Sequence, residues 1–264
     1  MTIVACLKWV SHPGEPHDER FSGMSPADQS ALEFALRQAE QTGTGVTAIT
    51  VGPSGADKVL RDALACGATR AIRIEAPTTA AGTDVATAIA DHIAEAQWVW
   101  CGDYSLDRGA GSVPAFIAAH LLAEQALGVI AAELHDGSVH ATRRLDGGRR
   151  ELLEVHAPAV VSVEGATARL RRAGLHSLRT AAGATIEVIA ATTPIHQAEF
   201  MVRAYRPRAR ELPAPAGEGP LDRLRVLTDA TTSSAARGEK TTLEPAEAAE
   251  RIIRALRDWG YLTP

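Results

Sequence analysis

The sequence predicts an α/β fold, in which a mostly parallel sheet carries helices on both faces, with added antiparallel strands and an extended C-terminal arm that ends in a helix. Three observations predict it. Apolar runs and helical patterns alternate over the first half of the chain. Shorter runs separated by Asp-Gly turns follow, and after about residue 190 the periodicity is lost until a last amphipathic segment. We therefore expect an α/β domain over residues 1–190 and an arm over 191–264.

The first part of the chain begins with a strand and a helix. A buried strand is expected over residues 2–10, followed by a loop or short hairpin over 11–24 that is rich in Pro and Gly. Ser25 followed by Pro26 is typical of a helix N-terminus, and Gly43 ends the apolar repeat of that helix.

Three further strand–helix units follow in order. The strands are GVTAITVG, ATRAIRIEA and QWVWCG, and the helices are SGADKVLRDALACG with a Ser cap, TDVATAIADHIAEA opened by Thr83 and Asp84, and residues 111–124. The strands are continuously apolar, as in a sheet covered on both faces. Alternating strands and helices of this kind need a parallel sheet.

The later part of the chain follows a different pattern. Asp136-Gly137 and Asp146-Gly147 mark tight turns between short strands, which predicts antiparallel strands added to the sheet. Residues 205–240 carry several Pro, Gly, Ser and Thr residues and are expected to be an extended arm. An amphipathic helix over 244–258 would need a surface to dock on, either on its own domain or on another subunit.

Composition excludes several classes of function. Charged residues make up 22 %, aromatic residues 4 %, and the net charge is −5, which gives no electrostatic surface for nucleic acid or an anionic membrane. No apolar run approaches the roughly 20 residues needed to span a bilayer. Cys6, Cys66 and Cys101 match neither a metal site nor a disulfide framework, so they are expected to be small core residues in a cytoplasmic protein.

The segment after the strand QWVW is the best candidate for a binding site. Ligands of open parallel sheets bind beyond the carboxyl ends of the strands. Gly109 and Gly111 allow close approach of a phosphate, Ser112 offers a hydroxyl, and the next helix offers its N-terminal N–H groups. The spacing matches neither the dinucleotide fingerprint nor the P-loop, so an ordinary Gly-rich connection stays open as the alternative.

Other strand ends agree with this position. They are the turn after Val51 and the helix start at Ser25, where Asp28 is expected to cap its helix or, less simply, to hold a ribose hydroxyl. No G-x-S-x-G elbow and no H-E-x-x-H motif occurs in the sequence, and Asp103 and Asp107 are expected to shape their loop or touch a ligand. The sequence thus predicts a binding protein with no catalytic residues and no metal site.

Ordered motifs over residues 1–190 and the closing helix resemble the beta subunit of electron transfer flavoproteins. The segment from Ala27 to Ile74 follows the family pattern, and Ala63–Ile72 follows A-L-A-M-G-A-D-R-A-I with Cys66 for Met and Thr69 for Asp. Gly102 and Asp107 followed by Gly111-x-Val113-Pro114 resemble its nucleotide loop. Pro158-Ala159-Val160-Val161 and Ile186-Glu187-Val188 also fall where the family has them.

The resemblance implies a Rossmann-like, adenine nucleotide alpha hydrolase-like fold and a heterodimer with an alpha subunit. One FAD would lie mostly in the alpha subunit, partly covered by the loop after the first strand, and the beta subunit would hold AMP or a second FAD. The subunit would carry electrons from dehydrogenases to an acceptor, with redox chemistry in the flavin and not in an enzyme active site of its own. Nucleotide contacts carried over by position would be Cys6, Ser25, Pro26, Ala27, Asp28, Val51, Gly102, Asp103, Tyr104, Ser105, Leu106, Asp107, Arg108, Gly109, Ala110, Gly111, Ser112 and Val113.

The sequence departs from the family pattern at four places. Lys8-Trp9-Val10-Ser11 replaces K-Q-V-P, Ser25-Pro26 replaces Asn-Pro, residues 168–172 lack the N-E-P-R segment before the dehydrogenase-docking loop, and residues 180–185 lack its lysines. These changes leave the electron donor and the nucleotide open, and a divergent actinobacterial paralogue, such as one that serves a mycofactocin system, is one reading.

Two alternatives of the same fold class are an adenylating enzyme and a homodimeric ATP- or AMP-binding stress-type protein. The segment after strand one lacks the pyrophosphate loop expected of an adenylating enzyme. The long arm argues against the stress-type protein.

Overall fold

A computed structural model describes residues 1–10, 22–135, 137–197, 215, 217–228 and 242–262. The chain forms two compact units, Met1–Met201 and Val202–Pro264. Within the described part of the chain, none of the helices combines the length and the apolar character needed to cross a membrane.

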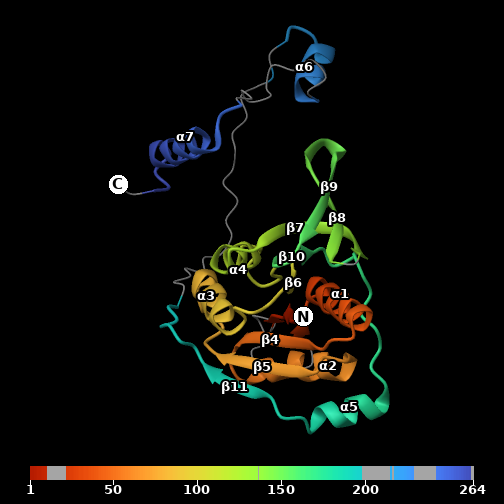
Figure 1. Ribbon diagram of the computed structural model, residues 1–264. Coiled ribbons are helices and arrows are strands. Elements are labelled where there is room, and N and C mark those ends of the chain that lie inside the picture. The colour runs from red at the N-terminus through yellow and green to blue at the C-terminus, as the bar shows by residue number, and fades with distance from the viewer. Residues whose placement is uncertain (11–21, 136, 198–214, 216, 229–241, 263–264) are drawn as a thin grey trace. The chain divides into compact units, whose positions relative to one another are not determined.

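A nine-stranded sheet forms the centre of the first unit (Figure 1). Its order is β11 (Glu187–Ala190), β5 (Arg70–Glu75), β4 (Val46–Gly52), β1 (Ile3–Cys6), β6 (Trp98–Gly102), β10 (Ala159–Val163), β7 (Glu124–His135), β8 (Ser138–Arg144) and β9 (Arg150–His156). Every pair from β11 to β7 is parallel, whereas β8 and β9 are antiparallel. The mostly parallel sheet with added antiparallel strands is therefore confirmed.

Helices pack on both faces of this sheet, as predicted. α1 (Pro26–Thr42) and α2 (Asp57–Cys66) contribute Leu32 and Leu60 to one buried cluster, together with Trp100. α3 (Gly82–His92) and α4 (Val113–Leu121) contribute Ile89 and Ile117 to a separate cluster on the other face. β1 and β6 are buried on both sides, which explains their continuous apolar sequences, whereas β4 and β5 also bury the polar side chains of Thr50 and Arg73.

The start and end of α1 follow the predicted signals. The Ser25 hydroxyl accepts a hydrogen bond from the Asp28 N–H at 3.0 Å, and Pro26 occupies the first turn. Gly43 ends the helix with φ 63°, a conformation in which a residue with a Cβ is strained.

The first strand is shorter than predicted. β1 ends at Cys6, and Trp9–Val10 (β2) pairs with Gly23–Met24 (β3) in a separate two-stranded antiparallel sheet. The Lys8 N–H turns to the Asp28 carboxylate at 3.3 Å, which takes the chain away from β4. A hairpin between residues 9 and 24 agrees with the predicted loop or hairpin, although residues 11–21 lie outside the described residues.

Several helix boundaries also differ from the prediction. Ser54 does not cap α2 but begins a 3₁₀ turn, η2 (Ser54–Ala56), and α3 starts at Gly82 without a side-chain cap. α5 (Leu175–Ala182) was not predicted. Its C-terminal carbonyls accept hydrogen bonds from Arg61 of α2 at 2.9–3.1 Å, so a distant contact stabilises this helix end.

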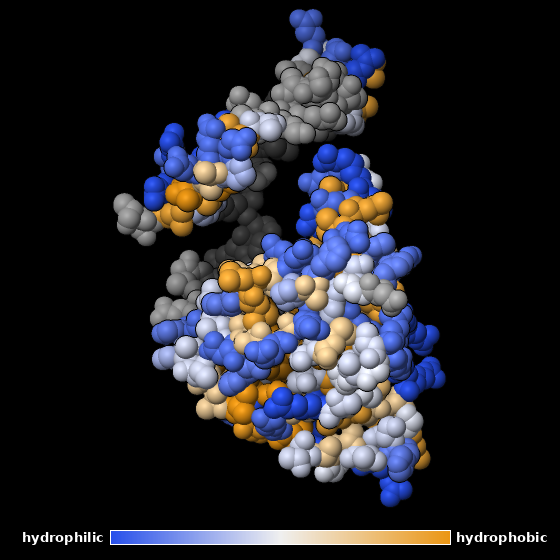
Figure 2. Space-filling view, viewed as in Figure 1, coloured by the Kyte–Doolittle hydropathy of each residue, from blue (hydrophilic) through white to orange (hydrophobic). Residues whose placement is uncertain are grey.

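The second unit contains two described helices. α6 (Pro220–Leu227) lies within the stretch predicted to be aperiodic, and that part of the prediction is wrong because Gly219 and Pro220 form a start signal that was overlooked. Residues 205–214, 216 and 229–240 of the same stretch lie outside the described residues. α7 (Pro245–Asp258) confirms the predicted closing helix, and Figure 2 shows its hydrophobic residues gathered on one side.

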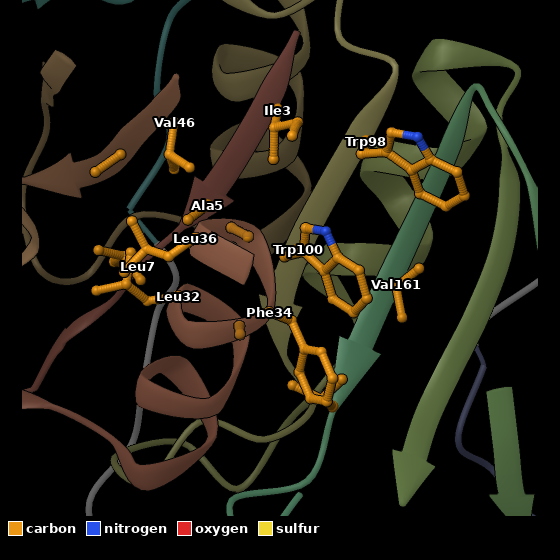
Figure 3. Close-up of a cluster of buried hydrophobic side chains, with 14 of the residues drawn as sticks. Ile3, Ala5, Leu7, Leu32, Phe34, Leu36, Val46, Trp98, Trp100 and Val161 are labelled. Atoms are coloured by element: carbon orange, nitrogen blue, oxygen red, sulfur yellow. The ribbon is translucent and has the colours of Figure 1, made fainter. Parts of the chain in front are cut away.

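Two tryptophans on one face of β6 fix this strand in the core (Figure 3). The Trp100 ring stacks on Phe34 of α1 with centroids 5.1 Å apart, and its indole N–H donates to the Gln38 side-chain oxygen at 2.9 Å. Burial of large aromatic rings is a major stabilising contribution. The position at which β6 ends, at Gly102, is therefore rigidly held relative to α1.

Candidate functional site

The strand order reverses between β1 and β6. From β1 the chain continues to β4 and β5 on one side, and from β6 the sheet continues to β10 on the other. The carboxyl ends at such a switch point form the usual ligand crevice of open α/β sheets. A cavity of about 420 Å³ lies there, within the size range of small-molecule sites.

The structure brings most of the sequence-predicted site residues together around this cavity. Four separate segments meet: the end of β1, the start of α1, the end of β4 and the loop between β6 and α4. The predicted residues that line the cavity are Cys6, Ser25, Asp28, Val51, Gly102, Tyr104, Ser105, Asp107, Arg108, Ala110, Gly111, Ser112 and Val113.

Five predicted residues do not line the cavity. Pro26 and Ala27 face the backbone at Gly165 and Gly102 instead, because α1 packs tightly there. Leu106 is 57 % exposed. The Asp103 carbonyl lies against Gly111, and Gly109 lies near the Tyr104 hydroxyl, so both belong to the internal packing of the loop. For these residues the structure shows a supporting position rather than a place on the cavity wall.

One wall of the cavity was not predicted from the sequence. Pro77, Thr78, Ala80, Ala81 and Gly82 line it between β5 and α3, as do Lys8 and Trp9 after β1. Two signals were available. Residues 77–82 follow a parallel strand, like the other candidates, and the family resemblance assigned a covering role to the loop after strand one.

Two glycines make the close approach at this site possible. A Cβ at Gly102 would lie 2.6 Å from an Asp28 carboxylate oxygen, and a Cβ at Gly111 would lie 1.9 Å from the Asp103 carbonyl oxygen. Real Cβ atoms do not approach neighbours this closely, so both positions require glycine. The loop from Gly102 to Val113 can only fold as it does because these side chains are absent.

Two helix N-termini open into the same cavity. α3 begins after Ala81 and α4 begins after Ser112, and in both cases no side chain caps the first turn. Residues at both starts line the cavity, and a Cβ at Gly82 would lie 3.6 Å from the Val113 side chain, so the two starts adjoin. The N–H groups and the positive dipole ends of both helices therefore favour an anion such as a phosphate group.

The carboxylate of Asp28 lies between β1, α1 and β6. It accepts hydrogen bonds from the Ser25 hydroxyl at 3.0 Å and from the Lys8 N–H at 3.3 Å. Burial raises the pKa of Asp28 to about 6, although hydrogen bonds from Ser25, Lys8 and Gly102 oppose the rise. The predicted capping role falls to Ser25, and Asp28 instead joins three elements beneath the cavity.

Lys8 connects the first strand to the loop between β6 and α4. Its ammonium donates to the Ser105 hydroxyl at 2.7 Å and to Asp107 at 2.5 Å. Burial raises the pKa of Asp107, but the hydrogen bonds from Lys8 and Ser105 outweigh it and the pKa is lowered overall. An incoming phosphate group would compete with Asp107 for this ammonium.

Cys6 and Cys101 lie side by side at the floor of the cavity, on neighbouring strands β1 and β6. Both are buried, and a hydrogen bond with Cys6 together with burial raises the pKa of the Cys101 thiol. A high pKa keeps that thiol protonated and a poor nucleophile. Cys66 is half-buried elsewhere, on α2.

The described residues around the cavity offer several groups that can bind a ligand. Among the described lining residues there is no histidine, and within the described ranges no group of three His, Cys, Asp or Glu side chains could hold a metal ion. Glycine-lined backbone, two helix N-termini and one ammonium are the typical features of a phosphate site.

Comparison with known proteins identifies the family. The model of the electron transfer flavoprotein domain matches residues 18–194. The match spans well over half of the chain and includes α1–α5, β11 and the loop that lines the cavity.

Curated relatives agree with this match. The chain is 33 % identical to an electron transfer flavoprotein subunit beta of Thermoanaerobacterium thermosaccharolyticum over 53 % of its length and 55 % of the relative, so it spans only about half of that protein. It is 30 % identical to the corresponding subunit of Methylophilus methylotrophus over 68 % of this chain and 72 % of the relative. It is also 30 % identical to protein FixA of Azorhizobium caulinodans, over 71 % of this chain and 74 % of the relative.

Proposed function

The chain belongs to the electron transfer flavoprotein family, as a beta-type electron transfer subunit, and from this premise we propose that it binds an adenine nucleotide in the cavity between β1 and β6 and pairs with an alpha-type subunit. The bound nucleotide would be AMP or a second FAD, and the chain would help to cover the FAD of the alpha-type subunit. Electrons would pass from dehydrogenases to an acceptor, in the cytoplasm.

One observation carries the nucleotide proposal. The uncapped N-termini of α3 and α4 adjoin at a glycine-lined cavity at the strand switch point. In this arrangement the N–H groups near Gly111 and Val113 would hold the phosphate, and Lys8 would add a positive charge. An ordinary Gly-rich connection would need neither glycines whose replacement would clash nor two helix starts at one cavity.

The flavin proposal assigns a positioning role to this chain. The flavin supplies the electron transfer when it is bound. The chain's own residues would bind, orient and exclude water: the Trp9 indole, which lines the cavity mouth and packs on Gly55, offers an apolar aromatic surface for this.

Partner docking has two candidate surfaces, each in its own unit. Leu175 and Leu178 of α5 are 76 % and 45 % exposed, and they lie between the two segments that depart from the family pattern on either side of the dehydrogenase-docking loop. On α7, Ile252 and Trp259 are 60 % and 71 % exposed. Exposed apolar side chains in such groups mark interaction sites rather than the ordinary surface.

Co-expression with an alpha-type electron transfer flavoprotein subunit of the same organism tests the proposal. We expect a yellow complex that contains both chains and elutes as a heterodimer, while this chain alone is colourless. A colourless mixture, or a chain that stays a homodimer in the presence of the alpha-type subunit, would contradict the proposal. Consumption of ATP by the purified chain would instead support the adenylating enzyme.

A further inference from the structure

We propose that Arg108 is a positioning residue that sets one wall of the cavity and links nucleotide binding to residues 192–197, the segment that leads out of the first unit. The proposal rests on the proposed nucleotide site and goes beyond it. It gives Arg108 a structural role in addition to its place among the residues that line the cavity.

Arg108 connects two walls of the cavity. It belongs to the loop between β6 and α4, and its guanidinium donates to the Ala80 carbonyl at 2.6 Å and to the Thr78 carbonyl on the opposite wall. The loop that presents Arg108 is held by its own backbone bonds, from Gly109 N–H to the Ser105 carbonyl and from Ser105 N–H to the Ala110 carbonyl, both at 2.9 Å. A planar guanidinium with two carbonyl acceptors fixes the distance and the orientation of these walls.

The wall that Arg108 binds is itself paired with residues 192–197. The Ala81 N–H donates to the His196 carbonyl at 2.9 Å, and Ala80 forms an antiparallel bridge with Gln197. Ala80 therefore takes part in both contacts: its carbonyl accepts from Arg108, and its backbone bridges to Gln197. A shift of this wall would therefore disturb both the hydrogen bond from Arg108 and the bridge to Gln197.

The same segment is fastened to α3 at two points. The Asp84 carboxylate accepts from the His196 N–H at 2.7 Å and contacts the His196 ring at 2.9 Å, and Thr192 donates to Asp91. Ile195 packs on the core cluster that lies under the cavity. None of Asp84, Asp91, Thr192 and His196 lines the cavity, so an effect of these residues on nucleotide binding would have to travel through the wall.

The consequence is a reciprocal linkage. If nucleotide binding favours the arrangement in which Arg108 holds the wall, it must also favour the pairing of residues 192–197, and the reverse holds equally. Occupancy of the cavity would thus influence the pairing of residues 192–197, which end with the last described residue of the first unit.

Hydrogen exchange of the nucleotide-free protein tests the structural half of the linkage. In Arg108→Ala we expect the amide of Ala81 and that of His196 to exchange about tenfold faster than in the wild type, since roughly 1.4 kcal/mol corresponds to a factor of ten. Arg108→Lys keeps the charge but loses the planar fork, and we expect an intermediate effect. Arg179→Ala, which removes an arginine of α5 outside the cavity, is the matched control and should leave both amides unchanged.

Nucleotide binding tests the functional half. We expect His196→Ala to weaken AMP binding by about threefold and Arg108→Ala by about tenfold, with a double variant that loses less than the product of the two, because residues in one path couple. Isothermal titration with AMP, and separately with FAD, measures this. The expected pattern needs no contact between His196 and the ligand.

The two experiments distinguish a failure of the Arg108 linkage from a failure of the proposed nucleotide site. If AMP and FAD both fail to bind the wild-type chain and its heterodimer, the proposed nucleotide site is wrong, while the exchange experiment still decides on the structural link. If AMP binds equally well to wild type and to both single variants, or if the Ala81 and His196 amides exchange as in wild type when Arg108 is replaced, the linkage is overturned.

Discussion

At the residue scale, Asp28 is the group whose chemistry is most altered by the fold. Burial raises its pKa from 3.8 to about 6, because a carboxylate without water is costly. A group with a raised folded pKa contributes stability that is fully present below its unfolded pKa and is lost as the pH rises through the folded value. The protein should therefore lose stability between about pH 4 and pH 7 through this residue.

Asp28→Asn should remove that dependence. We expect the change in unfolding free energy between pH 5 and pH 8 to be smaller in the variant by about 1.4 kcal/mol, because only the part of the raised pKa that lies above pH 5 contributes in this window. Urea unfolding at both pH values measures it, and Asp146→Asn, in an exposed turn, is the control. An Asp28→Asn protein with the same pH profile as wild type would contradict the buried, proton-binding role.

Replacement of Gly111 tests whether the loop between β6 and α4 holds the ligand. A methyl group there would meet the Asp103 carbonyl oxygen at 1.9 Å, so Gly111→Ala must displace the loop. We expect AMP binding to weaken by more than about tenfold and stability to fall by about 1–3 kcal/mol. Gly174→Ala adds the same atom where nothing lies within 4 Å, and titration should show normal AMP binding. Equal affinities for the two variants would show that the loop does not hold the ligand.

The sequence pointed to a loop that lines the cavity in the structure, but not to the atoms of that loop that face it. Gly111 and Ser112 could be singled out because glycine and a helix start have local meaning. Arg108 was included only by position in a run, and Ala80 was missed, because their contact joins residues far apart in the chain. Long-range pairing of this kind has no local sequence signature.

At the element scale, a buried ion pair fastens residues 165–171 to α1. Glu33 is 5 % exposed and accepts from the Arg171 N–H and guanidinium at 3.0–3.2 Å. Burial raises the pKa of Glu33, but hydrogen bonds from Arg171 and Arg37 lower it overall. Glu40 adds a second acceptor for Arg171 on the surface.

Arg171→Met should be destabilising. Without Arg171, the buried Glu33 carboxylate keeps only Arg37 as a charged partner and loses several hydrogen bonds, which we expect to cost about 1–3 kcal/mol in unfolding free energy. Chemical unfolding measures it, with Arg144→Met as the control, because the Arg144–Glu164 pair is largely exposed and such pairs contribute less than about 1 kcal/mol. Similar losses in the two variants would mean that the buried pair has no special weight.

The exposed apolar side of α7 is predicted to bind the alpha-type subunit. Ile252 and Ile253 are exposed on a helix with a charged opposite side. Ile252→Ser with Ile253→Ser should weaken the complex with the alpha-type subunit by about tenfold or more, while unfolding of the first unit is unchanged. Size-exclusion titration of the two subunits measures it, and Glu247→Ser is the control on the same helix. An unaffected complex would exclude this face of α7 from the interface.

Elements with strong local patterns were predicted well. α1, β4, β6 and α7 have apolar periodicity and clear end signals, and the structure confirms them. α5 and α6 were missed because each is only eight residues long, and α5 depends on Arg61 of another helix. β1 ends before Lys8, whose N–H donates a hydrogen bond to the Asp28 carboxylate. No pattern in the sequence reveals a contact between residues this far apart.

At the scale of the whole molecule, the fold creates the site by topology. The strand order reverses between β1 and β6 and leaves a crevice at the carboxyl ends of these strands. Five separate segments meet there, counting the wall between β5 and α3. The alternation of strands and helices predicted this crevice without any knowledge of the strand order. The proposal that the ligand is an adenine nucleotide rests on the positive helix ends and the family, not on the topology alone.

The small molecules released from the denatured heterodimer test the central claim most directly. If the cavity between β1 and β6 holds an adenine nucleotide, mass spectrometry should find one FAD together with AMP, or a second FAD in its place, and the second nucleotide should be lost in Gly111→Ala. A heterodimer that releases a single FAD and no further nucleotide would contradict the account.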